Sequence, residues 1–465
     1  MVFSSAIFLF YFLPAFLFVY YVTPWKNATL LLGSLIFYAW GEPRFVPLLM
    51  LSALLNYVFG VLIGRAGATR RPLLALGISA NLGLLLYYKY AAFLVDISNQ
   101  VFGRHANLPA IVLPLGISFF TFQGLSYLID VYRGHVDSQK SFLNFAMYKA
   151  MFPQLIAGPI VRYQQIAAEI EHRHIDNVRL SLGFRLFVLG LAQKVLIANA
   201  VGLPADTLFG VGPAHLDAAS AWLAVACYSI QILFDFAGYS NMAIGIGHML
   251  GFSYPPNFDR PYSARSITEF WRRWHISLSS WFRDYVYIPL GGNRGGSLRT
   301  YVNLSIVFLL CGLWHGAAWT FIIWGAWHGA LLVAERAGLG ALMQRLPALA
   351  AQAITLLCVM LGWVFFRASD VPSALAFIKT MFGFGSVATQ LHPWQMDVGA
   401  AQWSTLAIGT ILALWSEPLE RAMARALPAP LRSFKLKGAA VLVAYLACIA
   451  TLAVGTYNPF IYFHF

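Results

Sequence analysis

Charged side chains are scarce in this sequence. Asp, Glu, Lys and Arg make up only 11% of its 465 residues, whereas hydrophobic residues make up 59%. That apolar share exceeds the ~45–50% that is typical of soluble globular domains. So low a charge content argues against a water-soluble protein and predicts a polytopic membrane protein instead.

Acidic residues are the scarcer of the two charged classes. The chain has 18 Asp and Glu against 31 Lys and Arg, which gives a formal net charge of +13. In a membrane protein such an excess indicates cytoplasmic loops and contact with anionic lipids. It does not imply a nucleic-acid partner.

Cysteine is also scarce. The four cysteines stand singly in apolar runs, at Cys227, Cys311, Cys358 and Cys448. This spacing gives neither a disulfide framework nor a zinc ribbon, so we expect small buried side chains. Cys311 and His315 do have an i,i+4 spacing, but a third ligand is lacking nearby, and we therefore expect no metal site.

Apolar runs recur from one end of the chain to the other, so we expect a single membrane domain over residues 1–465. A membrane-crossing helix needs ~20 apolar residues, and the runs predict roughly ten to twelve transmembrane helices. The first run lacks the basic start and cleavage site of a signal peptide, so we expect it to be retained as a span. The runs are Ile7–Val22, Ala28–Trp40, Val46–Ile63, Leu73–Val95, Ile111–Leu128, Leu180–Ala200, Ala218–Phe236, Tyr301–Ala334, Ile354–Phe366, Trp403–Trp415 and Ala439–Val454.

Two further segments do not have the pattern of a spanning helix. Phe142–Val161 is apolar but contains Pro153, Gly158 and Pro159. Non-helical backbone at membrane depth needs protein or water to satisfy its polar groups, so this segment predicts a re-entrant or cavity-lining element. Gln164–Leu180 mixes isoleucines with charged residues, which predicts an interfacial helix.

A basic and aromatic segment extends from Arg260 to Arg299. Interleaved arginines and aromatic rings favour a membrane-surface position, because stems and rings are buried while the charges stay in water. The Gly-rich stretch Gly291–Gly296 predicts a flexible turn, and it lacks the flanking strand and Lys-Ser/Thr of a nucleotide-binding loop. The arginines are Arg260, Arg265, Arg272, Arg273, Arg283, Arg294 and Arg299, and the aromatic residues are Phe270, Trp271, Trp274, Trp281, Phe282 and Tyr285.

The string Trp-His-Gly-Ala occurs twice, with its histidines at His315 and His328, inside the uncharged stretch Tyr301–Ala334. Ionisable groups at membrane depth are costly and mark functional sites. As one helix this stretch would be ~51 Å long, well beyond a ~30 Å hydrocarbon core. We therefore expect a strong tilt or a break at Gly312 or Gly316. The two histidines should not share one helix face.

Several of these motifs closely resemble the membrane-bound O-acyltransferase (MBOAT) family, and above all its bacterial alginate O-acetyltransferase branch. The most specific is the stretch Ser266–Tyr285 with its Trp-Arg-Arg-Trp-His core. Asn241 departs from the Asp that we expect in many members of the branch. The other motifs are the two Trp-His-Gly-Ala strings, Leu290–Gly296, Met1–Ser5, Pro153–Pro159 and Phe234–Gly245.

The resemblance implies a reaction and its participants. It implies an all-α polytopic fold with re-entrant and interfacial helices around a buried tunnel, in a bacterial cytoplasmic (inner) membrane. It implies acetyl transfer from a thioester donor, acetyl-CoA, toward a hydroxyl of an exopolysaccharide such as alginate, without a bound cofactor. It also implies an outward-facing partner, periplasmic or at the cell surface, with a serine hydrolase-like fold.

Three histidines are the candidate catalytic residues. His328 matches the family's near-universal histidine, and we expect it to be the general base for the acceptor hydroxyl. His275 matches a position that is Asn, Asp or His in other branches. It should donate a hydrogen bond to the oxyanion, because Asn can donate but cannot usefully take a proton. His315 is the third candidate. The alternative for His328 is a structural hydrogen bond, and that for His275 is a place among lipid headgroups. The alternative for His315 is to line the cavity or fix a helix break.

Arg272, Arg273 and Arg283 are candidates for the CoA phosphates, because Arg pairs bidentately with phosphate. Their alternative role is to anchor the chain to lipid headgroups. Asp235, beside Tyr239 and Ser240, indicates a polar network between helices or, alternatively, an acceptor contact.

Other functions remain open at this point. Within the family they are acylation of cellulose or peptidoglycan and D-alanyl transfer to teichoic acid. A proton-coupled transporter is the alternative from a different class, in which the histidines relay protons. Transporters commonly have duplicated halves, and the only repeat that we find is the four-residue string.

Overall fold

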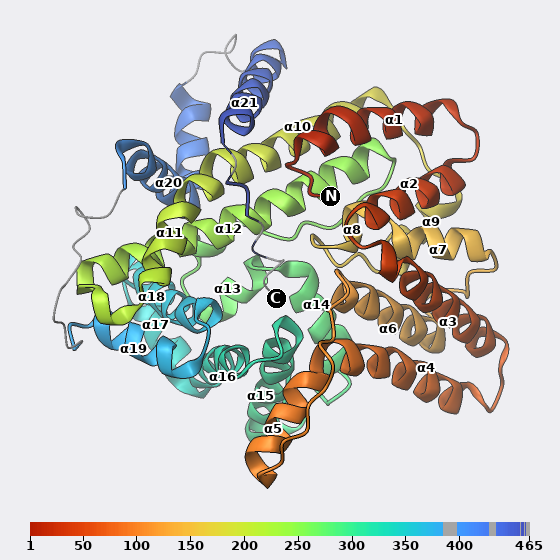
Figure 1. Ribbon diagram of the computed structural model, residues 1–465, viewed down its shortest axis with the longest axis horizontal. Helices are drawn as coiled ribbons and strands as arrows, with labels where there is room; N and C mark the ends of the chain where they lie inside the picture. Colours follow the sequence, from red (N-terminus) through yellow and green to blue (C-terminus); the bar gives the residue numbers. More distant parts are fainter. Residues whose placement is uncertain (385–397, 427–433, 456, 460, 462–465) are drawn as a thin grey trace. The chain divides into compact units, whose positions relative to one another are not determined.

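Every regular element in the described part of the chain is helical, which confirms the all-α class. The computed structural model describes residues 1–384, 398–426, 434–455, 457–459 and 461 (Figure 1). It contains α-helices joined by short 3-10 and π-helical turns. The chain groups into two compact units, Met1–Phe187 with Met242–Pro255 and Val188–Asn241 with Pro256–Phe465. A single domain over residues 1–465 stays a prediction.

The helices of the first unit come mainly from the N-terminal part of the chain. They are α1 (Leu13–Val22), α2 (Lys26–Gly41), α3 (Val46–Arg65), α4 (Arg70–Leu85), α5 (Ala91–Phe102), α6 (Ile117–Arg133), α7 (Phe142–Ala150), α8 (Phe152–Leu155), α9 (Tyr163–Glu171), most of α10 (Asn177–Ala192) and the end of α12 (Ala218–Met249).

The second unit contains the remaining parts of α10 and α12 and all later helices. These are α11 (Asn199–Val211), α13 (Ile267–Arg273), α14 (Ile276–Phe282), α15 (Gly296–His315), α16 (Trp319–Ala334), α17 (Gly340–Arg345), α18 (Ala348–Arg367), α19 (Val371–Met381), α20 (Ala400–Ala426) and α21 (Phe434–Val454).

Six helical segments of the described residues are long and apolar enough to cross a membrane, and three shorter apolar helices accompany them. The expected spans Ala28–Trp40 and Ile111–Leu128 correspond to α2 and α6, which have 16 and 17 residues and are not among the six. The multi-pass character is therefore supported, while ten to twelve crossings stay a prediction. The six are Pro43–Arg65, Arg70–Phe102, Asn177–Val211, Ala218–Met249, Gly296–His315 and Ala348–Arg367.

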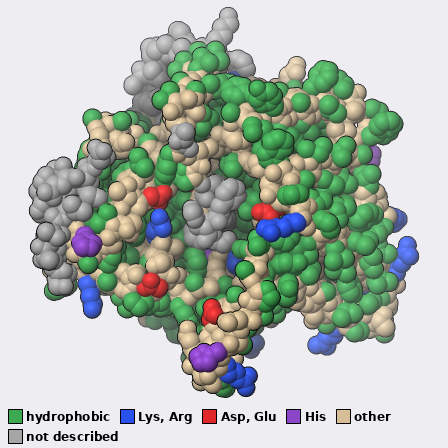
Figure 2. All heavy atoms as spheres, viewed as in Figure 1, with side chains coloured by type: hydrophobic (Ala, Val, Ile, Leu, Met, Phe, Trp, Pro, Cys, Tyr) green, Lys and Arg blue, Asp and Glu red, His purple; other side chains and the backbone are tan. Residues whose placement is uncertain are grey.

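Hydrophobic side chains also cover much of the outer surface. On the face shown in Figure 2 they far outnumber the charged side chains. Several of the largest are strongly exposed, among them Tyr11 (73%), Trp25 (74%) and Leu298 (77%). A soluble protein rarely exposes large apolar patches, whereas lipid chains cover such a surface without cost.

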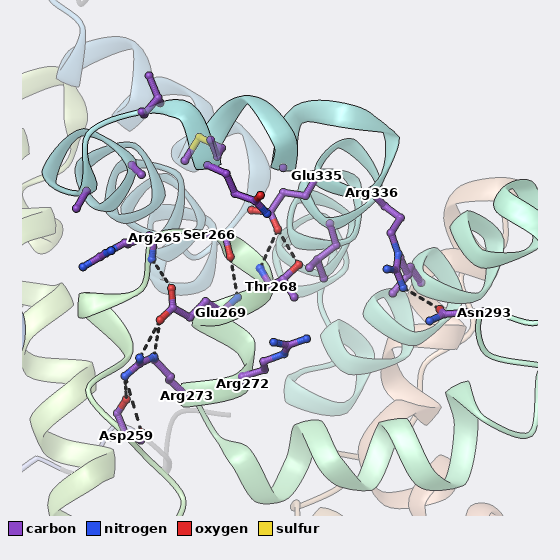
Figure 3. A pocket seen from close by; sticks show the side chains of 18 of the residues that line it. Asp259, Arg265, Ser266, Thr268, Glu269, Arg272, Arg273, Asn293, Glu335 and Arg336 are labelled. Atoms are coloured by element: carbon purple, nitrogen blue, oxygen red, sulfur yellow. Dashed lines mark hydrogen bonds and ion pairs between the residues drawn. The ribbon is translucent and has the colours of Figure 1, made fainter.

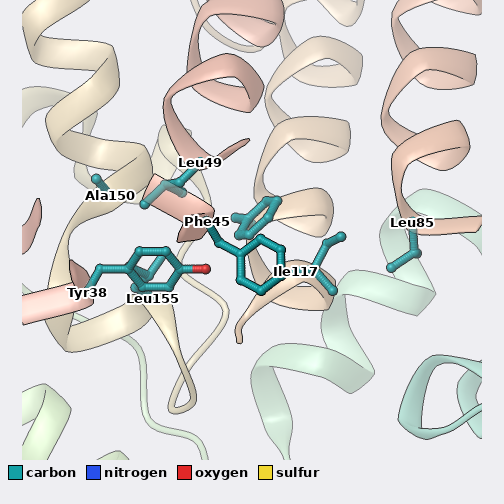
Figure 4. Packing of buried hydrophobic residues seen from close by; sticks show 8 residues of the cluster. Tyr38, Phe45, Leu49, Leu85, Ile117, Ala150 and Leu155 are labelled. Atoms are coloured by element: carbon teal, nitrogen blue, oxygen red, sulfur yellow. The ribbon is translucent and has the colours of Figure 1, made fainter. Parts of the chain in front are cut away.

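The first unit has an apolar core between α2, α3, α4, α6, α7 and α8. Figure 4 shows this cluster, which consists of Tyr38, Phe45, Leu49, Leu85, Ile117, Phe120, Ala150 and Leu155. Each member is at most 9% exposed. Burial of a large apolar side chain contributes ~1.5–3 kcal/mol, so this cluster fixes how the helices of this unit pack.

The predicted break in Phe142–Val161 is present. The segment forms the two short helices α7 and α8, and residues 156–162 are buried without regular structure. Side chains of the same unit satisfy part of this backbone. Tyr148 donates to the Val161 carbonyl (3.1 Å), and Gln154 donates to the Tyr148 carbonyl (2.6 Å). Buried irregular backbone of this kind persists because protein groups replace water.

The predicted interfacial helix Gln164–Leu180 is wrong in its extent. Helix α9 ends at Glu171, and the next helix begins at Asn177. Two side chains explain the break. The Arg173 guanidinium lies 4.7 Å from the centre of the Phe252 ring, which draws the chain inward. Asp176 accepts the Arg179 amide (2.7 Å) and so caps a new helix.

The uncharged stretch breaks where its glycines predicted. Helix α15 ends at His315, and Gly316 has extended backbone (φ −159°, ψ 153°) before α16 begins. The two helices then pack with their backbones close together. A Cβ atom on Gly312 would collide with the Phe321 carbonyl oxygen, and one on Gly325 with the Phe308 carbonyl oxygen. Two glycines therefore permit the close contact between α15 and α16.

Gly325→Ala is expected to destabilise this helix pair. The added methyl group would meet backbone, which cannot move aside like a side chain, and overpacking of this kind costs about 1–3 kcal/mol. Denaturant unfolding of the detergent-solubilised protein measures the loss. Gly83→Ala is the matched control, because a Cβ atom there would meet nothing within 4 Å. Equal stability of the two variants would contradict the close packing.

Candidate active site

Helix α13 carries the Trp-Arg-Arg segment and begins at an unusually complete cap. The Ser266 hydroxyl accepts the Glu269 amide (3.0 Å). The Glu335 carboxylate accepts the amides of Ile267 (2.5 Å) and Thr268 (2.9 Å), and also the Thr268 hydroxyl (2.7 Å). The first backbone amides of a helix have no partner within it. Here the amides of Ile267, Thr268 and Glu269 each bind a side-chain oxygen. This seven-residue helix is thus held at a fixed position by a residue that directly follows α16.

His275 lies in the tight connection between α13 and α14. Its φ of 43° and ψ of 54° are left-handed, a conformation that costs a non-glycine residue of order 1–3 kcal/mol and is common at functional sites. The side chain is fully buried. Its Nδ1 lies 3.1 Å from Oδ1 of Asn257, and its ring lies 4.7 Å from that of Phe236. Burial lowers the pKa of His275 to about 3, so the ring is neutral at pH 7.

His328 lies in the middle of α16 and is also fully buried. The Trp271 indole N–H donates to its Nδ1 (3.3 Å). The Phe270 ring stacks over it at 6.1 Å, and the Trp324 ring meets it edge-on at 5.2 Å. Its Nε2 is buried and has no hydrogen-bond partner among the described residues. An aromatic shell thus holds the imidazole and leaves one nitrogen for another molecule.

His315, the last residue of α15, brings the other two histidines into one cluster. Its ring lies 6.5 Å from that of His275 and 4.9 Å from that of Trp324, which in turn contacts His328. The two Trp-His-Gly-Ala strings therefore stand on separate helices, as the glycine break predicted. The ring contact is between His275 and His315, whereas the sequence favoured a working pair of His275 with His328.

A small void lies beside the cluster. It measures about 10 Å³ and is lined by Ile232, Phe236, Trp274, His315, Trp324, Trp363, Phe366 and Ile461. A cavity needs about 10–15 Å³ to hold one water molecule. The void is therefore no larger than about one water molecule, and the side chains of the cluster are closely packed.

A much larger pocket, of about 990 Å³, lies at the start of α13 (Figure 3). Of the three predicted phosphate-binding arginines it contains Arg272 and Arg273, whereas Arg283 is not among its lining residues. Arg283 instead pairs with the neighbouring Asp284 (2.7 Å) and is 62% exposed. The sequence missed two further arginines of this pocket, Arg265 and Arg336.

The charges in the pocket are partly neutralised. Arg273 pairs with Glu269 (2.8 Å), whereas Arg336 keeps its charge and donates to the neutral amide of Asn293 (2.9 Å). Arg272 is exposed and forms no ion pair with any described residue, and Figure 3 shows it without a marked contact. Arg272 and Arg265, which are exposed and have no ion pair with a described residue, are therefore the cations best placed to bind an anionic ligand.

The interleaved aromatic rings are buried, as the sequence predicted, and the protein itself buries them. Phe270, Trp271, Trp274, Trp281, Phe282 and Tyr285 are all at most 8% exposed. They are buried because they pack on one another and on the histidines, for example Trp271 on His328. Arg265, Arg272 and Arg283 are exposed, as expected of charges that stay in water, while the membrane-surface position of the segment stays a prediction.

Sequence reasoning also missed Asn257, Trp271 and Glu335 as partners of the site. Glu335 had a usable signal, since it is the first charged residue after the uncharged stretch and stands seven positions after His328, on the same helical face. Asn257 had none. A group of three or more His, Cys, Asp or Glu that could bind a metal is absent from the described residues.

A comparison with protein families identifies the family to which the chain belongs. Residues 134–367 match the membrane-bound O-acyltransferase family model. The chain belongs to the membrane-bound O-acyltransferase family. All three histidines and all four pocket arginines lie within the matched range, so this member of the MBOAT family carries its candidate site there.

Individual relatives match over most of their length. A Pseudomonas putida protein named "probable alginate O-acetylase AlgI" is 41% identical to this chain, and the match covers 100% of both. A Pseudomonas aeruginosa protein of the same name is 42% identical over 89% of this chain and 79% of its own. A Helicobacter pylori protein named "peptidoglycan O-acetyltransferase" is 38% identical over 83% of this chain and 81% of its own. The protein is thus a membrane O-acyltransferase.

Proposed function

We propose that this protein takes acetyl from acetyl-CoA at the cytoplasmic side of a bacterial inner membrane and passes it outward, for O-acetylation of an exopolysaccharide such as alginate. The observation that carries the proposal is the closely packed cluster of three buried histidines, in which Nε2 of His328 has no hydrogen-bond partner among the described residues. Relatives named probable alginate O-acetylases, which match this chain at about 40% identity, support the choice of acceptor.

Acyl transfer needs two catalytic functions that imidazoles can provide. One imidazole removes the proton of the acceptor hydroxyl as it attacks the thioester carbonyl. A second donates a hydrogen bond to the oxyanion that forms, which is most effective in a water-poor site. His275 and His328 are our candidates for these two functions. His315, in ring contact with His275, completes the cluster.

The pocket at the start of α13 is our candidate for the donor. Its volume of about 990 Å³ is at the upper end of the ~300–1,000 Å³ usual for small-molecule sites. Four arginines suit the phosphates of CoA. Of these only Arg273 is held in ion pairs with described residues, and Arg272 is exposed and forms none there. Arg283 lies outside the pocket, and a lipid-headgroup contact suits it better.

Three finer features belong to the same proposal. The whole chain acts as one acyltransferase domain, and a buried tunnel lets the donor and the outward acceptor meet at the histidines. An outward-facing serine hydrolase-like partner carries acetyl to the polymer. The acceptor can instead be peptidoglycan, as the name of the Helicobacter pylori relative suggests.

Purified protein with labelled acetyl-CoA tests the proposal. We expect release of CoA that depends on the acceptor, and acetylated alginate when the partner is present. Muropeptides offered in place of alginate test the second acceptor. Proton flux into proteoliposomes without acetyl-CoA, and no acetyl transfer, would indicate the transporter instead.

Arg272→Ala is expected to weaken donor binding. Loss of one charge-assisted hydrogen bond costs ~1.5–3 kcal/mol, so the KM for acetyl-CoA should rise about tenfold or more at an unchanged kcat. S-acetylpantetheine lacks the CoA phosphates, and its KM should not change. Arg294→Ala is the control, since this exposed arginine is not among the lining residues. Equal effects on both donors would argue against a phosphate contact.

A further inference from the structure

Glu335 joins the two helices that meet at His328. It follows α16 directly and stands two helical turns after His328, so both side chains lie on the same face. Its carboxylate accepts the Ile267 amide (2.5 Å), the Thr268 amide (2.9 Å) and the Thr268 hydroxyl (2.7 Å). Hydrogen bonds to an ionised acceptor are roughly twice as strong as neutral ones. Three such bonds therefore hold the beginning of α13 to the end of α16.

The same short helix also contacts His328 and the large pocket. One turn after Thr268, the Trp271 indole N–H donates to Nδ1 of His328 (3.3 Å), and the two rings lie 5.2 Å apart. The next residue, Arg272, lines the pocket. Helix α13 has only seven residues, so a shift at its start moves both side chains. The contact of Trp271 with His328 thus depends on how the start of α13 is held.

We propose that Glu335 is a positioning residue for acyl transfer, because it fixes the start of α13 against α16 and so sets the contact of Trp271 with His328. This rests on the proposed function, in which His328 is a catalytic residue. Glu335 acts through the indole and the imidazole. A role of this kind can have a large effect, since misplacement by about 1 Å far from the chemistry can cost about 10²-fold in rate.

Glu335 also lines the large pocket, and a simpler role there predicts a different result. A carboxylate in that pocket repels the phosphates of CoA. If this were its whole effect, removal of Glu335 would lower the KM for acetyl-CoA and leave kcat unchanged. A positioning role predicts a fall in kcat with little change in KM. Separate measurement of kcat and KM therefore distinguishes the two roles.

Glu335→Ala tests the positioning role in the full-length, detergent-solubilised protein. We expect kcat to fall at least tenfold while the KM for acetyl-CoA changes less than threefold, because the altered contact is the one with His328. Glu335→Gln keeps one oxygen that can accept an amide, and its kcat should be at least threefold above that of Glu335→Ala. A lower KM at an unchanged kcat in Glu335→Ala would overturn the inference.

Ser266→Ala is the matched control for the loss of a helix cap. The Ser266 hydroxyl accepts the Glu269 amide (3.0 Å), within the first turn of the same helix. This variant therefore weakens the start of α13 without releasing it from α16. Its kcat should fall less than threefold. An equal fall in Ser266→Ala and Glu335→Ala would show that capping of α13 matters and that its attachment to α16 does not.

A double-mutant cycle tests whether Glu335 acts through Trp271. Trp271→Phe removes the indole N–H and keeps a large ring, so kcat should fall in this variant too. The effects of independent residues on the activation free energy add. Glu335→Ala should instead cost less than a further threefold in the Trp271→Phe background, because the contact that it positions is already lost. In the Trp327→Phe background the loss should remain at least tenfold, since that indole donates to the Cys358 carbonyl (2.9 Å). Full additivity in the Trp271→Phe background would contradict the proposed route.

Nitrogen NMR of protein with 15N-labelled tryptophan tests the contact without any reaction. The indole signal that is lost in Trp271→Phe belongs to Trp271. It should shift in Glu335→Ala, as it does in His328→Ala, and should keep its position in Ser266→Ala. An unshifted signal in Glu335→Ala would disprove the inference. Absence of turnover with acetyl-CoA in the unaltered protein would instead count against the proposed function and leave this spectroscopic result intact.

Discussion

Replacement of His328 with alanine is expected to lower the rate of acetyl transfer by about 10²–10⁴-fold, the usual contribution of a positioned general base. A loss of about 10²–10³-fold would follow if this ring were the oxyanion donor instead. The buried position in an aromatic shell makes this a local change, because Phe270, Trp271 and Trp324 surround the ring. The measurement is CoA release from labelled acetyl-CoA at saturating donor.

The control for this variant is His174→Ala. The His174 side chain is 80% exposed, and its Nε2 lies 3.5 Å from the Asp176 carboxylate. It is not one of the histidines of the buried cluster. Its loss should change the rate by less than twofold. Unchanged turnover in His328→Ala would remove this residue from the catalytic site, whatever the fate of the wider proposal.

Replacement of Asp235 with asparagine is expected to lower the free energy of unfolding by about 3–5 kcal/mol, as loss of one partner of a buried ion pair usually does. The Asp235 carboxylate lies 2.6 Å from the Lys194 ammonium, and both side chains are 2% exposed. Without Asp235, the lysine is left as an unpaired charge in the interior. Denaturant unfolding curves of the detergent-solubilised protein measure the change in the free energy of unfolding.

The same pair also holds a segment near the end of the chain. Lys194 donates to the Pro459 carbonyl, and Asp235 accepts the Ile461 amide (2.9 Å). Hydrogen exchange at the Ile461 amide should therefore become faster in Asp235→Asn.

Two further variants serve as controls for the stability loss expected in Asp235→Asn. Replacement of both partners, in Lys194→Met with Asp235→Leu, should recover most of the stability, because no charge is then buried. Arg283→Met breaks an exposed pair and should cost less than about 1 kcal/mol. A stability loss in Asp235→Asn no larger than in Arg283→Met would show that the buried pair contributes little.

The membrane class, the reaction family and the helix break were all predictable from the sequence. Hydrophobic content and run length reflect the solvent that surrounds the chain, so composition alone indicates a membrane protein. Helix α15 ends next to Gly316, because glycine is a poor residue for the interior of a helix. These predictions depend on local composition and need no distant contact.

The partners of the histidines could not be predicted, because each comes from a distant part of the chain. Asn257 reaches His275 from 18 positions away, and Trp271 reaches His328 from 57 positions away. The fate of Arg283 depended on packing in the same way, since one arginine of a run can face a pocket while another pairs with its neighbour.

The sequence by itself determined that two histidines of a repeated string lie in an uncharged stretch, on different faces or different helices. Only the tertiary structure decided which side chains hold these rings: Trp271 on α13 donates to Nδ1 of His328, and Asn257 lies at Nδ1 of His275. The hydrogen bond at one ring nitrogen governs what the other can do, and these partners are set by how distant segments pack together. The chemistry of these imidazoles is therefore a property of the fold, although the imidazoles themselves are visible in the sequence.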